Sequence, residues 1–308
     1  MPELETIPEA PHRSSVTDVR RATRVARSSR RKSPMRKSPA LAAVQYGWAI
    51  VLAVFTLFPF YWMLVSALRG SDDVLTSRLM PGPFTLEGFV NLMDVTPFPT
   101  YLTNSMIVSL SVTALTIVIV TPIAYALSKM RGRLGRALGF SVLLGYMVPE
   151  VLLMIPIFVI LVRINLDNSL AGLVVGLLSV TMPLGLWLMT GFMKTIPSAL
   201  EEAARIDGAS WLEIFWHVIL PLARPGILTV GIFSFIIGWT DYLFALIMIR
   251  SEELKTLPVG LSTLYGKFDS SWSEIMAGAV LVSIPAIVLV AATARHFVGG
   301  LSQGATKG

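Results

Sequence analysis

The feature that most constrains this chain is a series of long apolar runs. Charged residues make up only 14% of its 308 residues and hydrophobic residues 54%, whereas soluble domains carry about 25% charged residues. A run of about 20 apolar residues is long enough to cross a bilayer as a helix. We therefore expect an all-α integral membrane protein with six transmembrane helices. The six runs cover roughly residues 41–68, 103–128, 137–162, 170–192, 225–249 and 275–297.

The apolar runs also contain or adjoin several prolines. A proline removes a backbone hydrogen bond and kinks its helix, and a membrane tolerates this where neighbouring groups satisfy the freed carbonyls. Static anchors have no need of kinked spans, whereas helix bundles that rock between states often contain them, although rigid bundles contain them as well. The pattern favours a transporter. The prolines are Pro59, Pro122, Pro149, Pro156, Pro183 and Pro285.

The distribution of lysine and arginine predicts the orientation, because basic loops remain in the cytoplasm. The tail 1–40, the loops 129–136 and 193–224 and the C-terminal end together hold 19 Lys and Arg residues, and the opposite loops hold 6. With six spans both termini face the same side. We therefore expect both termini to be cytoplasmic.

The chain is expected to have one folded domain. Residues 1–40 are rich in Arg, Ser and Pro and poor in aromatic residues, a composition that does not build a core. They are predicted to be a disordered basic cytoplasmic tail that contacts anionic lipid, with nucleic-acid binding as the alternative reading. Residues 41–308 form the six-span domain, interrupted by a polar loop at 193–224.

This polar loop contains the stretch "PSALEEAARIDGASWLEIFWHVILPLARPG" at 197–226. Two S-x-x-E capping boxes predict two helix starts, one at Ser198 with Glu201 and the other at Ser210 with Glu213. Gly208 lies between them, where a left-handed glycine commonly ends a helix. The loop is therefore predicted to form two short helices hinged at Gly208. Two prolines are expected to close the second helix, Pro221 and Pro225.

The first of these helices, near residues 199–207, carries small side chains on adjacent turns. Ala199, Ala203 and Ile206 share one side, with Ala204 beside them. Alanines let another surface approach closely, which favours docking, although alanine is also simply a good helix former.

The spacing of this loop resembles a family motif. Glu202-Ala203-Ala204, Gly208 and Ile219-Leu220-Pro221 fit the pattern E-A-A-x3-G-x10-I-x-L-P, except that Ile219 and Leu220 are adjacent. The pattern belongs to the transmembrane permease subunits of bacterial ABC importers, and the chain is similar to the maltose-type, carbohydrate-uptake branch. "TNSMIVS" at 103–109, "AYALSKMRGRLGR" at 124–136, "AARIDGAS" at 203–210 and "GLSQGATKG" at 300–308 also resemble that branch.

The resemblance implies a function and a set of partners. In that family the loop is a cytoplasmic coupling helix that inserts into a groove of an ATPase subunit, so the docking residues would be Glu202, Ala203, Ala204 and Gly208. The expected assembly contains a second, different permease, two ATPase subunits and an extracytoplasmic solute-binding protein, in the bacterial inner membrane. The expected solute is a sugar or oligosaccharide. Glycerol-3-phosphate importers have similar permeases and remain an alternative.

The sequence contains no nucleotide-binding or catalytic motif of its own. A phosphate-binding loop would read G-x-x-x-x-G-K-[ST], and Gly266-Lys267 is followed by Phe268. There is no cysteine, no H-E-x-x-H and no G-x-S-x-G. We therefore expect a non-catalytic subunit without a cofactor or metal, whose partner ATPase uses ATP and Mg²⁺. A stand-alone carrier driven by an ion gradient and a membrane scaffold remain as rivals.

Two ionisable residues lie well within the apolar runs, Glu150 and Asp241. Ionisable residues inside a membrane often mark a solute path. Asp241 falls in a predicted single-helix stripe with Ser234, Gly238 and Ala245. The alternative is that each carboxylate is a packed polar residue.

Aromatic residues flank both carboxylates. Trp239 and Tyr242 lie beside Asp241, and Tyr146 lies near Glu150. Aromatic faces with a few hydrogen-bonding groups suit sugars, because the C–H faces of a sugar stack on rings while its hydroxyls form hydrogen bonds. These aromatic residues and the two carboxylates are the predicted substrate path.

Overall fold

The computed structural model describes residues 39–69, 83–130, 132–266 and 272–304, and these residues are almost entirely helical, with no strand among them. The chain divides into two compact units, residues 1–58 and 59–308. The boundary falls inside α2 (Pro39–Ala67). The expected basic tail lies, apart from its last two residues, outside the described part of the chain.

Four of the six apolar runs form continuous helices that are long and apolar enough to cross a membrane. This confirms the all-α membrane fold expected from the sequence. The prolines at 59, 122, 183 and 285 lie inside these helices. The helices are α2, α4 (Phe98–Lys129), α7 (Leu170–Met193) and α14 (Trp272–Gly304).

The third run is a pair of helices, α5 (Gly132–Met147) and α6 (Glu150–Arg163). The two helices meet at an angle of 93°. Pro149 is the N-cap of α6, and a proline at this position disfavours helical backbone in the residue before it. The predicted kink is therefore a full break in this run.

The fifth run is also broken. It contains α11 (Arg224–Thr240) and the short α12 (Leu243–Met248), separated at Asp241 and Tyr242. A second bend, of 71°, separates residues 211–222 from α11. Counted with each bent pair as one span, the described residues contain up to six candidate spans.

Short helices connect these spans. Three of them, α9, η2 and α10, follow one another without a gap, so residues 211–222 form one helical segment whose middle part is a π-helix. The short helices are α3 (Glu87–Val95), α8 (Ser198–Ile206), α9 (Trp211–Glu213), η2 (Ile214–Ile219), α10 (Leu220–Leu222), η3 (Glu252–Leu254), α13 (Leu257–Ser262) and η4 (Thr263–Gly266).

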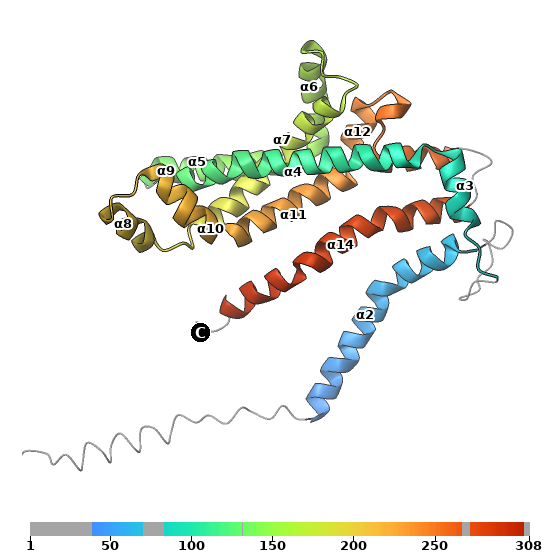
Figure 1. Cartoon of the computed structure of the whole chain (residues 1–308), viewed down its shortest axis with the longest axis horizontal. Helices are drawn as coiled ribbons and strands as arrows, with labels where there is room; N and C mark the ends of the chain where they lie inside the picture. Colours follow the sequence, from blue (N-terminus) through green and yellow to red (C-terminus); the bar gives the residue numbers. More distant parts are fainter. Residues whose placement is uncertain (1–38, 70–82, 131, 267–271, 305–308) are drawn as a thin grey trace, which may run out of the picture. The chain divides into compact units, whose positions relative to one another are not determined.

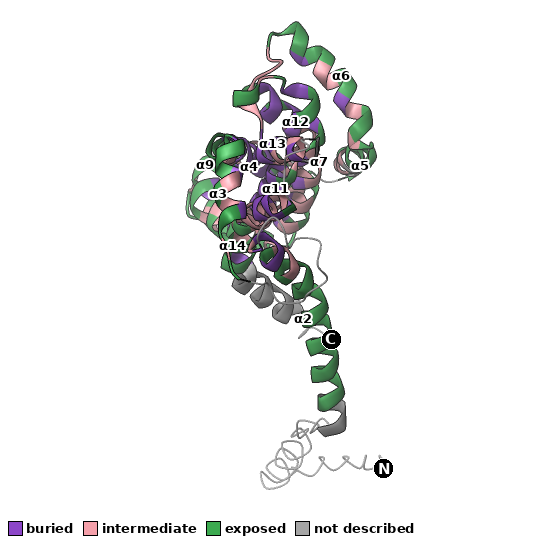
Figure 2. Cartoon of the chain, turned by 90° about the vertical axis from the view of Figure 1, so that its right-hand side faces the viewer, coloured by how far each residue is buried: buried purple, intermediate pink, exposed green. Residues whose placement is uncertain are grey.

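The helix α4 lies at the centre of the larger unit and packs along α7 and α11 (Figure 1). A buried hydrogen bond of 2.9 Å between the hydroxyls of Thr116 and Thr181 joins α4 to α7. Buried residues gather on α4, α7 and α11, whereas α6 is mostly exposed (Figure 2). Exposed apolar surface of this extent is typical of contact with lipid or with a partner protein.

One of the core clusters joins the polar loop to the spans. It contains residues of α4, α7 and α11 together with Ile214, Phe215 and Ile219 of the loop. The loop is therefore packed against the ends of the spans, and this packing fixes the position of the short helices described next.

Candidate functional site

The predicted first helix of the polar loop is α8, but its capping box does not form. The N-cap residue is Pro197, which offers no side-chain hydrogen bond, and Ser198 is already helical. The prediction of a Ser198–Glu201 capping box is therefore wrong. The Glu201 carboxylate does not take part in capping and instead contacts α4.

Glu201 is the buried residue of α8. Its carboxylate forms an ion pair with the Lys129 ammonium and accepts a hydrogen bond of 3.2 Å from the Tyr125 hydroxyl. Lys129 and Tyr125 both lie at the end of α4. A buried carboxylate is costly unless it is paired and hydrogen-bonded, so these contacts hold α8 against α4. Sequence reasoning missed this cluster, since Lys129 and Glu201 are 72 residues apart.

The hinge and the second capping box are confirmed. Gly208 has φ of +85°, in the left-handed region that glycine adopts without a steric penalty. The Ser210 hydroxyl accepts a hydrogen bond from the Glu213 amide at 3.3 Å, and the Glu213 carboxylate accepts one from the Ser210 amide at 2.7 Å. The side-chain hydrogen bond and then the backbone hydrogen bond with Ser210 lower the pKa of the Glu213 carboxyl.

The second helix contains a π-helical part that the sequence did not predict. Residues 214–219 form a π-helix, and the helical segment continues through Pro221 to Leu222. Pro221 lies in the last turn of this continuous segment. Pro225 begins the next helix, α11. The segment ends at Leu222, between the two prolines that were expected to close it.

The four expected docking residues divide into an outward and an inward group. Glu202, Ala203 and Gly208 are exposed, whereas Ala204 is half-buried. Ala204 packs against the core cluster of the loop. The outward face of α8 is thus formed by Glu202 and Ala203 together with Ala199 and Ile206, of which Ile206 is 86% exposed.

Asp241 lies in a break between helices, so the prediction of one continuous helical stripe is wrong. Its backbone is extended at the end of α11. The carboxylate accepts hydrogen bonds from the amides of Phe244 at 3.3 Å and Ala245 at 3.0 Å. The N-cap residue of α12 is Tyr242, whose side chain does not cap. Asp241 therefore satisfies amides that the start of α12 would leave unpaired.

The two aromatic residues beside Asp241 differ in their surroundings. Trp239 is 1% exposed, its ring is stacked on Phe235 at 5.8 Å, and its indole N–H donates to the Val282 carbonyl at 3.0 Å. In this structure Trp239 belongs to the core, and its ring faces are not available to a solute. Tyr242 is 37% exposed.

One cavity is lined by both Tyr146 and Glu150, two residues of the predicted substrate path. The cavity has a volume of ≈ 390 Å³ and lies at the break between α5 and α6. This volume is within the range of about 300–1,000 Å³ that small-molecule sites occupy. Asp241 is not among the residues that line this cavity. Ser179, Phe233 and Ile237 complete the opposite wall.

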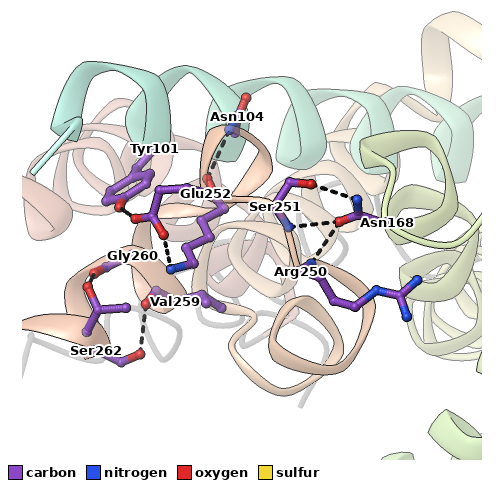
Figure 3. Close-up of polar contacts among 11 residues, drawn as sticks. Tyr101, Asn104, Asn168, Arg250, Ser251, Glu252, Val259, Gly260 and Ser262 are labelled. Carbon is purple, nitrogen blue, oxygen red and sulfur yellow. Dashed lines mark hydrogen bonds and ion pairs between the residues drawn. The ribbon is translucent and has the colours of Figure 1, made fainter. Parts of the chain in front are cut away.

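A second polar cluster lies at the other end of α4, and sequence reasoning missed it. Tyr101 donates a hydrogen bond to Glu252, and the Ser105 hydroxyl accepts one from the Leu257 amide at 2.8 Å. Asn104 and Ser105 lie in the "TNSMIVS" segment. The resemblance of this segment to the carbohydrate-uptake branch was the sequence signal that could have pointed to the cluster. Figure 3 shows Tyr101 and Asn104 of α4 directed toward residues 250–257, named here the 250–257 loop.

Asn168 holds the same loop from another side. Its side-chain oxygen accepts hydrogen bonds from the amides of Arg250 at 2.8 Å and Ser251 at 3.0 Å, and its amide group donates to the Ser251 hydroxyl at 2.7 Å (Figure 3). Arg250 also forms an ion pair with Asp167. The 250–257 loop is therefore a fixed element attached to α4 and to the start of α7.

The residues that the structure describes contain no group of three or more His, Cys, Asp or Glu side chains arranged to hold a metal ion. The arrangement instead offers an exposed short helix at one end of α4 and a small cavity beside the broken third span.

The comparisons with known proteins agree with this architecture. Residues 119–303, more than half of the chain, match the family described as the binding-protein-dependent transport system inner membrane component. The chain is 32% identical to the inner membrane ABC transporter permease protein YcjP of Escherichia coli over 266 residues, which cover 85% of this chain and 95% of that protein.

Two further relatives have names that specify a solute. The diacetylchitobiose uptake system permease protein DasC of Streptomyces coelicolor is 33% identical, with 84% of this chain and 95% of that protein covered. The trehalose/maltose transport system permease protein MalG of Thermococcus litoralis has the same identity and coverage. A crystal structure of a bacterial ABC transporter involved in alginate import has a TM-score of 0.72 at 24% identity, with 86% of this chain and 100% of that chain covered, which supports the fold.

Proposed function

The chain belongs to the family of binding-protein-dependent transport system inner membrane components, and from this premise we propose that it is a permease subunit of an ATP-driven importer for a sugar or oligosaccharide. The similarity to permeases named for diacetylchitobiose and for trehalose and maltose supports the solute class. A solute-binding protein would deliver the solute. A second, different permease would complete the path across the membrane.

The observation that carries this proposal is the geometry of α8, named from here the docking helix (Ser198–Ile206). It is short, its outward face carries Glu202 and Ala203, and its inward face is anchored to α4 through Glu201. Small side chains let a partner approach closely, and Glu202 offers it a charge. We assign Ala204 and Gly208 to the support of this face, because Ala204 packs inward and Gly208 sets the turn to the next helix.

The partner at this face is an ATPase subunit, one of two in the assembly. The permease itself binds no nucleotide in this account, and ATP and Mg²⁺ are bound by the ATPase subunits. The docking helix and both termini then lie in the cytoplasm, which agrees with the charge difference of 19 to 6 Lys and Arg residues between the two sides. The 250–257 loop lies on the opposite side, where a binding protein arrives.

The solute path runs beside the broken third span. The cavity lined by Tyr146 and Glu150 supports this assignment, because it combines a ring, a carboxylate and the hydroxyl of Ser179. Asp241 fixes the start of α12. Tyr146 and Tyr242 are exposed aromatic residues of this region, whereas Trp239 supports the path from within the core.

The function is tested by uptake in cells that express the complete transport system. Radiolabelled maltose, trehalose and chitobiose are compared with glycerol-3-phosphate. We expect uptake of at least one of the sugars to stop on ATP depletion and to persist when an uncoupler collapses the ion gradient. Loss of uptake with the uncoupler at constant ATP would instead identify a gradient-driven carrier. Uptake of glycerol-3-phosphate alone would contradict the solute class.

A further inference from the structure

We propose that Glu201 is a positioning residue that ties the docking helix to α4 and so transmits the movement of the ATPase to the spans. Glu201, Lys129 and Tyr125 form what is named here the α4 clamp. The proposal rests on the proposed function, because it takes the ATPase as the partner of the docking helix. The proposal adds the contact through which the movement of the ATPase reaches the spans.

The α4 clamp is built as a closed unit. The Glu201 side chain is 5% exposed and the Lys129 side chain 36% exposed, and the carboxylate has partners on the last two turns of α4. The Lys129 ammonium also lies 5.4 Å from the centre of the Tyr125 ring, a cation–π contact. Each member therefore contacts the other two.

Two aromatic residues of the second helix of the loop pack against Tyr125. The Tyr125 ring lies 5.6 Å from that of Phe215 and 6.0 Å from that of Trp211. The Trp211 and Phe215 rings are stacked at 6.1 Å. The docking helix and the segment that follows Gly208 therefore converge on one side chain of α4.

The contacts of the docking helix explain why the clamp transmits movement. Glu201 is its buried residue, and the other charged residues, Glu202 and Arg205, are exposed. Ala204 adds only a small apolar contact. Among the side-chain contacts of the docking helix, the strongest link to the spans therefore passes through Glu201. Coupling between distant sites is carried by such contiguous contacts between rigid elements.

The helix α4 is suited to carry this movement further. It contains 32 residues, which corresponds to a length of about 48 Å at 1.5 Å per residue. It packs along α7 and α11, and its far end is hydrogen-bonded to the 250–257 loop through Asn104 and Ser105. A displacement at Glu201 thus reaches the helices of the solute path and the opposite end of the molecule.

The experiment measures coupling in proteoliposomes that contain the complete importer. Glu201→Gln and Lys129→Met each remove one charge of the clamp, and Lys194→Met is the matched control, because Lys194 is exposed and near the same loop. The outward face of the docking helix is unchanged, so the ATPase should still co-purify. The ATP hydrolysed per solute transported should rise several-fold in the two clamp variants and stay at the wild-type value in the control.

A covalent rescue separates positioning from a general structural role. The chain has no cysteine, so Lys129→Cys with Glu201→Cys provides a unique pair. Without a cross-linker this variant should be uncoupled, and a short bis-maleimide between the two thiols should restore the wild-type ratio of ATP to solute. The charge exchange Lys129→Glu with Glu201→Lys should recover more coupling than either single change.

The outcomes distinguish the two proposals. A wild-type ratio of ATP hydrolysed to solute transported in both Glu201→Gln and Lys129→Met would contradict the proposed role of the α4 clamp. A cross-linked cysteine pair that remains uncoupled would contradict it as well. If no ATPase co-purifies with the wild-type permease, the proposed function itself fails, whatever the clamp variants do.

Discussion

The side-chain amide of Asn104 donates hydrogen bonds to two carbonyls of the 250–257 loop, that of Glu253 at 2.8 Å and that of Lys255 at 3.0 Å. Asn104 is 7% exposed, so water cannot easily replace it. One side chain of α4 therefore satisfies two acceptors on a segment about 150 positions away in the sequence.

Replacement of Asn104 should loosen this loop. Asn104→Leu leaves both carbonyls without their donor, and an unsatisfied buried polar group costs about 1–3 kcal/mol. We expect faster proteolysis after Lys255 and a lower midpoint of thermal unfolding in detergent. Thr103→Val is the control, because Thr103 is exposed and its hydroxyl bonds only to the Pro99 carbonyl of the same helix. Equal behaviour of the two variants would contradict the role of Asn104.

The turn at Gly208 should be sensitive to backbone strain alone. No atom lies within 4 Å of a Cβ built at this position, but φ is +85°. A β-branched side chain is strongly disfavoured there, at a cost of about 1–2 kcal/mol, whereas asparagine tolerates the left-handed region. Gly208→Val should therefore reduce co-purification of the ATPase and Gly208→Asn should preserve it. If both variants retain the ATPase equally, the turn does not set the position of the docking helix.

Asp241 should act as a cap for α12. Asp241→Ala removes the acceptor for the Phe244 and Ala245 amides, and the loss of a cap costs about 0.5–2 kcal/mol. Asp241→Asn keeps one carbonyl oxygen and should be milder. We expect the alanine variant to show the lower thermal midpoint, and the asparagine variant to assemble normally with altered uptake or solute preference. Unchanged uptake in the asparagine variant would leave Asp241 with a structural role only.

The proposed topology is checked by labelling introduced cysteines. Ser33 and Ser270 lie outside the described residues, and the charge difference predicts that they are on opposite sides of the membrane. In this cysteine-free chain, a membrane-impermeant maleimide should label Ser270→Cys in intact cells and Ser33→Cys only after the membrane is opened. Labelling of Ser33→Cys in intact cells would contradict the proposed topology.

The loop between α7 and α11 shows what the sequence could predict. Gly208 and the Ser210–Glu213 box were predictable because both depend on neighbours within a few residues. The same S-x-x-E pattern fails at Ser198, because Pro197 takes the N-cap position and the buried Lys129–Glu201 pair competes for the carboxylate. That competition depends on a partner from another helix, which local spacing does not reveal.

The fifth run shows a similar limit. Its apolar residues continue on both sides of Thr240 and Asp241, so composition predicts one helix. The break appears only because the Asp241 carboxylate binds backbone amides of the next turn, an alternative to helix that aspartate side chains offer. Sequence placed Glu150 and Tyr146 correctly beside each other in the third run, but the cavity between them depends on the bend at Pro149.

The central claim is that the outward face of the docking helix binds the ATPase, and a bulky side chain on that face tests it most directly. Ala203 is the cleaner position, because it is exposed, whereas Ala204 packs against the chain's own core. Leu212→Trp is the control, since Leu212 is 57% exposed on the next helix and already large. Co-purification of the ATPase and ATP-dependent uptake are measured for each variant in gentle detergent and in cells.

We predict that Ala203→Trp inserts into the membrane and pairs with the second permease, but loses the ATPase and uptake, while Leu212→Trp retains both. ATPase recovered at the wild-type yield with Ala203→Trp, together with intact uptake, would contradict the account.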